Sequence, residues 1–95
     1  MTYPLDNKRW QLDRMEIFQR DDWTCQVCGG PLSVPQLAHR IGQRKMFLKM
    51  YGKEVIHHPL NLVSVCSLEC NAKVDISNRP AEVTELVQEI RSCLQ

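Results

Sequence analysis

Apolar residues recur every three or four positions in three segments of the chain, residues 7–22, 43–51 and 80–94. This spacing places apolar side chains along one side of an α-helix. The last segment has the clearest pattern, because Pro80 suits the first helical turn and glutamates fill the positions between the apolar ones. Its apolar residues are Val83, Leu86, Val87, Ile90 and Leu94. The sequence therefore predicts three amphipathic helices, the last of which covers the core.

Residues 32–41 have the alternating pattern of a β-hairpin, with Pro35 in the turn. In its second strand Leu37, His39 and Ile41 would share one face, because successive side chains of a strand point to opposite sides. Residues 54–59 are expected to form an extended connection. A further helix is expected to start near Ser67, a suitable N-cap residue, and to carry Cys70, Asn71 and Lys73.

Length and composition predict one small soluble domain. The chain has 95 residues and only two Phe, two Tyr and two Trp, so a metal ion would help to hold its small core together. It has no apolar run near the roughly 18–20 residues of a transmembrane helix, and its N-terminus does not resemble a signal peptide. We therefore expect a cytoplasmic protein that does not bind membranes.

Four of the five cysteines form two closely spaced pairs, a C-x2-C pair and a C-x3-C pair. This number and spacing are typical of a tetrahedral zinc site with a structural role. The predicted zinc ligands are Cys25, Cys28, Cys66 and Cys70. Cys93 lies apart in the last helix. The alternative is a secreted mini-protein with two short-range disulfides.

Positive charge is concentrated in the middle of the chain, although the net charge is only +1. No acidic residue occurs between Asp22 and Glu54. The basic residues in that interval are Arg40, Arg44, Lys45, Lys49 and Lys53. Such a local excess is typical of a phosphate-binding surface, and the alternative is a solvated helix face.

The ordered set of motifs resembles the HNH endonuclease family over roughly residues 9–75. Its parts are Arg14-x-x-Ile17-x-x-Arg20-Asp21, then Cys25-x-x-Cys28-Gly29, then His39, Asn61-Leu62 and Cys66…Cys70-Asn71-x-Lys73. The resemblance implies a small α+β fold with a ββα-metal (His-Me finger) core, zinc-stapled knuckles and flanking terminal helices. Residues 1–95 would form a single domain, with its core at about 9–77 and a C-terminal helix at about 80–94.

The resemblance also implies a role for each matching residue. The catalytic residues would be His39, the general base that activates water, and Asn61, which would hold the hairpin loop and orient His39. Asn71 would be a ligand of a catalytic Mg²⁺ or Mn²⁺ ion. His57 and His58, just before Pro59, could supply a further ligand, His58 being the one we select, and the alternative is two partly exposed loop histidines. The residues expected to contact nucleic acid, most plausibly double-stranded DNA, are Arg40, Arg44, Lys45, Lys49 and Lys73.

Two other functions fit the same residues. Ala38 precedes His39, where the family commonly has a metal ligand, and an alanine cannot bind a metal. A catalytically weakened, zinc-stapled nucleic-acid-binding module is therefore an alternative. A structural zinc domain that binds protein is a third possibility. The sequence leaves the target and the oligomeric state open, and a partner subunit is possible.

Overall fold

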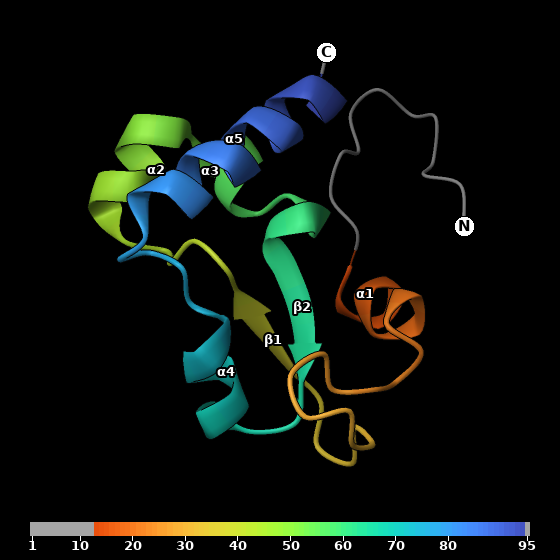
Figure 1. Cartoon of the computed structure of the whole chain (residues 1–95). Coiled ribbons are helices and arrows are strands. Elements are labelled where there is room, and N and C mark those ends of the chain that lie inside the picture. The colour runs from red at the N-terminus through yellow and green to blue at the C-terminus, as the bar shows by residue number, and fades with distance from the viewer. Residues whose placement is uncertain (1–12, 95) are drawn as a thin grey trace.

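The computed structural model describes residues 13–94 and combines short helices with a two-stranded sheet (Figure 1). The elements in chain order are α1 (Arg14–Arg20), β1 (Gln36–His39), α2 (Lys45–Tyr51), α3 (Lys53–Ile56), a 3-10 turn η1 (Pro59–Asn61), β2 (Leu62–Val65), α4 (Leu68–Val74) and α5 (Pro80–Leu94). This small α+β architecture agrees with the expected class.

Helix α1 is shorter than the predicted helix over residues 7–22. It begins after Asp13, whose side chain accepts a hydrogen bond from the backbone N–H of Glu16, while the Glu16 side chain accepts one from the Asp13 N–H. This capping box fixes the start of the helix, so the prediction that the helix runs through Asp13 is wrong. Residues 7–12 of the predicted helix lie outside the described residues.

Helix α1 ends in a Schellman motif. The N–H of Trp23 donates to the carbonyl of Phe18, and the N–H of Asp22 donates to the carbonyl of Gln19. Asp22 has a left-handed φ of 57°, and the rings of Phe18 and Trp23 pack with centroids 5.5 Å apart. The motif turns the chain sharply and directs it into the first cysteine pair.

The predicted hairpin over residues 32–41 is wrong, because β1 pairs with a distant strand. β1 and β2 are antiparallel, and His39 lies opposite Leu62. The segment expected to form the first hairpin strand pairs elsewhere: Pro31 bridges to Thr24, and the N–H of Leu32 donates to the carbonyl of Trp23. These contacts close the loop that carries the first cysteine pair and leave β1 free to pair with β2.

Helices α1 and α4 pack against the two strands, as Figure 1 shows. Leu37 and Leu62 pack with Ile17 of α1, whereas Ala38 and Val65 belong to an apolar cluster with Cys70 of α4. Because side chains alternate along a strand, His39 lies on the same face as Leu37 and Ala38 on the opposite one.

Residues 53–56 form α3 instead of the expected extended connection. Gly52 ends α2 with a left-handed φ of 85°, and its carbonyl accepts hydrogen bonds from Val55 and Ile56. Both of those side chains are buried. Burial of these two β-branched side chains against α5 therefore stabilises the short helix α3. The sequence has no longer helical pattern here that would have predicted it.

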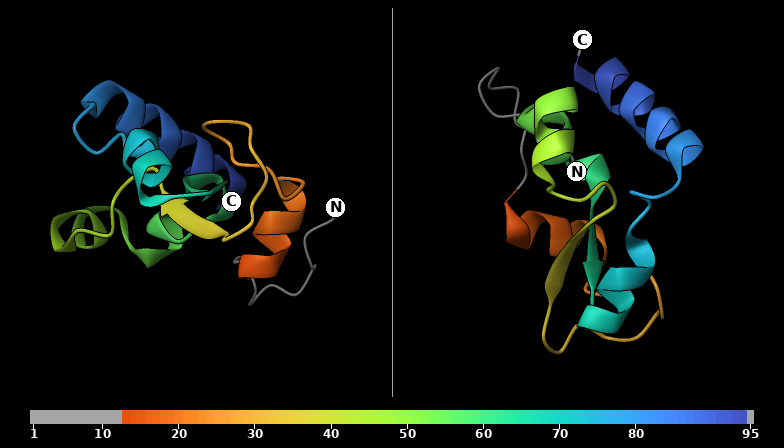
Figure 2. Two further views of the ribbon diagram at one scale, coloured as in Figure 1. Left: turned by 90° about the horizontal axis from the view of Figure 1, so that it is seen from below. Right: turned by 90° about the vertical axis from the view of Figure 1, so that its left-hand side faces the viewer.

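Helix α5 forms over the predicted residues and buries the predicted face, apart from the half-buried Leu94. It packs with α2 and α3 at one end of the molecule, and the right-hand view of Figure 2 shows α2 and α5 at the end opposite α4. A second apolar cluster lies between the sheet, α1, α4 and the cysteines. No helix within residues 13–94 has both the length and the apolar character needed to cross a membrane.

Candidate metal centre and histidine site

The four predicted zinc ligands lie together. Their sulfur atoms all lie within 4.8 Å of one another. The Cys66 sulfur is 3.5 Å from the Cys28 sulfur and 3.8 Å from the Cys70 sulfur. Four thiolates bound tetrahedrally at about 2.3 Å from Zn²⁺ would be about 3.8 Å apart. Because a disulfide is only about 2.0 Å long, the disulfide alternative does not fit these free cysteines. The group can hold a metal such as zinc.

Local backbone structure positions the sulfur atoms. The N–H of Cys25 donates to the carbonyl of Gly30 at 2.8 Å, and the N–H of Cys28 points at the Cys25 sulfur at 3.5 Å. In the second pair, the Ser67 hydroxyl accepts from the N–H of Cys70 and caps α4, as predicted. Cys28 and Cys66 are 38 positions apart in the chain, so a bound ion would join two distant segments.

Electrostatics distinguish Cys25 from Cys66. Burial opposes ionisation of Cys25, but the N–H groups of Cys28, Val27 and Cys66 lower its pKa below that of a free thiol. Hydrogen bonds with Cys28, Cys25 and Cys70 raise the pKa of Cys66. The protein thus favours the thiolate of Cys25 and the thiol of Cys66.

His39 lies at the end of β1 and contacts His57, which follows α3. His39 Nε2 is 3.4 Å from His57 Nδ1, and the side-chain nitrogen of Gln43 is 3.1 Å from His39 Nδ1. Burial, followed by the charge of His57, lowers the pKa of His39. Both effects favour the neutral form of the His39 imidazole.

His57, rather than His58, is the histidine beside His39. His58 is 5% exposed, and its Nδ1 accepts a hydrogen bond from the N–H of Leu60, which caps η1. Burial lowers the pKa of His58. The sequence offered both histidines before Pro59, and only the short helix α3 decides which one faces His39.

Asn61 is fully buried and joins three segments through its side chain. Its Oδ1 accepts from the N–H of Ile41 at 2.7 Å. Its Nδ2 donates to the carbonyls of Ile41 at 3.1 Å and Ile56 at 2.7 Å. The Asn61 carbonyl also accepts from the N–H of Arg40. The side chain therefore holds the segment after His39, and its hydrogen bonds go to backbone groups and not to the imidazole.

Arg20 and Asp21, part of the first motif, support the same region. The Arg20 guanidinium donates to the carbonyls of Pro59 at 2.8 Å and Leu62 at 2.7 Å, on either side of Asn61. It also forms a bidentate ion pair with Asp21, whose carboxylate accepts from the N–H of Ser64. Although partial burial opposes ionisation, the Arg20 and Ser64 hydrogen bonds lower the pKa of Asp21.

The predicted catalytic cation ligands do not form a compact group like that of the cysteines. Asn71 is half-buried on α4, and Nδ1 of His58 already accepts the hydrogen bond that caps η1. Within residues 13–94, the cysteines are the only group of three or more His, Cys, Asp or Glu side chains close enough to hold one ion. Mg²⁺ prefers carboxylate and water oxygens, so imidazole and amide groups alone fit it poorly.

The basic residues predicted to contact nucleic acid lie on several elements. Arg44, Lys45 and Lys49 are exposed at or within α2, Lys73 is exposed on α4, and Arg40 is half-buried after β1. The Arg44 guanidinium lies 5.8 Å from the centroid of the Phe47 ring. Three of the five basic residues therefore lie at or within α2, which begins two residues after Gln43.

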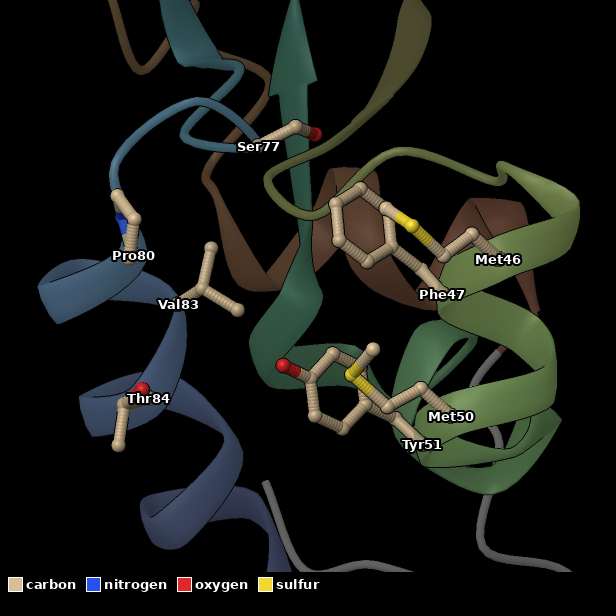
Figure 3. Close-up of a pocket in the computed structure, with 8 residues that line it drawn as sticks. All are labelled: Met46, Phe47, Met50, Tyr51, Ser77, Pro80, Val83 and Thr84. Atoms are coloured by element: carbon tan, nitrogen blue, oxygen red, sulfur yellow. The ribbon is translucent and has the colours of Figure 1, made fainter.

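A cleft of about 270 Å³ lies between α2 and α5, away from the cysteines (Figure 3). Met46, Phe47, Met50 and Tyr51 face it from the α2 side, and α5 contributes Pro80, Val83 and Thr84. Its lining includes no histidine, cysteine or carboxylate, so the groups suited to hydrolysis lie elsewhere.

No protein-family model, no curated protein and no solved structure matches this chain. The functional argument therefore rests on the residues and their geometry.

Proposed function

We propose that this protein is a DNA endonuclease of the HNH type, a phosphodiester hydrolase in which His39 is the general base. The proposal is carried by one observation, the half-buried imidazole of His39 beside the side chains of His57 and Gln43. The chain order of β1, β2 and α4 beside a tetrathiolate group also supports it, since the HNH resemblance implies a strand–strand–helix core.

The geometry gives His39 a workable protonation state. When Nε2 carries the proton and donates to His57, the lone pair of Nδ1 is free to accept a proton from water that attacks phosphorus. The Gln43 amide nitrogen lies 3.1 Å from Nδ1 and 3.0 Å from Nε2, so the amide would have to move aside for water to reach Nδ1. Asn61 and Arg20 contribute by fixing the backbone on both sides of the imidazole.

The test of this proposal is nicking of supercoiled plasmid with Mg²⁺ or Mn²⁺ added in separate reactions. A general base contributes about 10²–10⁴-fold, so His39→Ala should slow cleavage at least about 10²-fold. Gln88→Ala, on the exposed side of α5, is the control and should cleave like the wild type. Equal cleavage by His39→Ala would contradict the assignment of the base.

The basic residues of α2 would hold the DNA backbone. Replacing Arg44, Lys45 and Lys49 by alanine should weaken binding to every DNA sequence and reduce the salt slope by about two to three units, at about 0.9 per phosphate contact. A charge-matched control replaces exposed arginines outside α2, namely Arg14, Arg79 and Arg91. If the two triple variants bind alike, α2 has no special role in binding.

A second candidate function is nucleic-acid binding without cleavage, and Ala38 favours it. This residue is fully buried against α4 and supplies no ligand where the HNH family commonly has one. A protein of this kind would bind DNA with the salt dependence given above. It would leave plasmid intact under all metal conditions, which separates it from the endonuclease.

A further inference from the structure

The imidazoles of His39 and His57 lie close together, but the distance between their nearest nitrogen atoms is long for a hydrogen bond. Nε2 of His39 and Nδ1 of His57 are 3.4 Å apart, and the rings meet edge to face at 77°. Hydrogen bonds that nitrogen donates are usually about 2.9–3.0 Å long. The pair is thus held close by its surroundings more than by the bond between the rings.

The same distance suits two ligands of one metal ion. Two nitrogen atoms bound tetrahedrally at about 2.0–2.1 Å from Zn²⁺ would be about 3.3–3.4 Å apart. Neutral imidazole is a preferred ligand of zinc, copper, iron and nickel, whereas magnesium and calcium prefer oxygen. The spacing and the chemistry of the pair therefore both favour a borderline transition-metal ion.

The backbone on both sides of the pair is fixed by hydrogen bonds. The N–H of His57 donates to the carbonyl of Lys53 at 2.9 Å, and the N–H of Arg40, next to His39, donates to the carbonyl of Asn61 at 2.8 Å. The Gln43 amide lies 3.0 Å from His39 Nε2. Its oxygen could serve as a third ligand after rotation of the amide, whose orientation is assigned from the hydrogen-bond network.

We infer that His39 and His57 form a second metal site, specific for a transition-metal ion such as Zn²⁺ and weaker than the four-cysteine site. Two protein ligands and water would bind this ion, so it should exchange readily. One consequence rests on the proposed function. An ion on Nε2 of His39 leaves the ring proton on Nδ1, which then has no lone pair to accept a proton from water, so zinc beyond one equivalent should inhibit cleavage.

The test uses full-length protein that already contains one equivalent of Zn²⁺, without nucleic acid. Titration with further Zn²⁺ at pH 7.5, followed by calorimetry and by NMR of ¹⁵N-labelled imidazoles, should show a second equivalent bound. The ring signals of His39 and His57 should shift together and those of His58 should not. Titration with Mg²⁺ should leave all three histidines unchanged.

Variants of each histidine provide the matched controls, since the chain has three. His39→Ala and His57→Ala should each lose the second equivalent and keep the first, with far-UV circular dichroism checking their folding. His58→Asn retains an N-cap acceptor and should keep both equivalents. No second equivalent in the wild type, or one retained by His57→Ala, would overturn the inference.

These binding results are independent of cleavage. If zinc binds the pair but the wild type cleaves no DNA, the proposed endonuclease function fails and the metal site remains. If the wild type cleaves DNA and His57→Ala binds zinc as the wild type does, the endonuclease remains and the metal site fails.

Discussion

Substitution of Asn61 separates a structural role from a catalytic one. Asn61→Ala removes the partner of three backbone groups, the N–H and carbonyl of Ile41 and the carbonyl of Ile56. All three bonds are buried, and a buried polar group left without its partner costs about 1–3 kcal/mol. After allowance for water entering the vacated space, we expect the free energy of unfolding to fall by about 3–6 kcal/mol.

That loss is a large part of the roughly 5–15 kcal/mol that stabilises a small domain. The assay is unfolding of the zinc-loaded protein in urea, read by circular dichroism. Asn71→Ala, on the half-buried side of α4, is the control and should lose less than about 1 kcal/mol. Hydrogen exchange gives a local readout, since the Ile41 amide should lose its protection in Asn61→Ala only.

Cleavage measured on the folded fraction completes the argument. Because the hydrogen bonds of the Asn61 side chain go to backbone groups and not to the imidazole of His39, the folded variant should retain cleavage within about tenfold of the wild type. Our reasoning is refuted if Asn61→Ala loses less than about 1 kcal/mol, keeps the Ile41 amide protected and still loses most of its activity. Asn61 would then act in the reaction itself.

Three further outcomes follow from the structure. Ala38→Asp places a carboxylate at a fully buried position and should lower the free energy of unfolding by at least about 3 kcal/mol in urea unfolding, and a fully stable variant would contradict this burial. Because the pKa of His39 is lowered, cleavage should fall only below about pH 6.5, and His57→Gln should move this acidic limb to higher pH in rate–pH profiles. An acidic limb that does not move would rule out the charge effect. Cys66→Ser should lose the zinc found by elemental analysis and unfold, whereas Cys93→Ser should keep one equivalent, and equal zinc contents would disprove a four-cysteine site.

Local patterns in the sequence were sufficient where the structure depends on neighbouring residues. The bounds of α5 follow from its helical periodicity and from Pro80 at the first position. Ser67 caps α4 as its side chain predicts. The spacing of the cysteines predicted their grouping, because few arrangements other than a shared metal explain two such pairs.

Contacts between distant residues decided the rest. Leu32 pairs with Trp23 and not across a hairpin, and β1 takes β2 as its partner. Alternation indicates the two faces of a strand but carries no information about which segment pairs with it. That choice depends on burying Leu37 against α1 and Ala38 against α4 at the same time.

The candidate site shows the same division. The sequence singled out His39 and Asn61, but its pattern did not choose between His57 and His58 as the neighbour of His39. Nor did it predict that Asn61 would bind the backbone at both ends of the segment that carries α2 and α3. Gly52 and the burial of Val55 and Ile56 create α3, and α3 sets the direction of His57. Residue types thus determined which chemistry is possible, and packing determined which side chains meet, because burial depends on the whole chain.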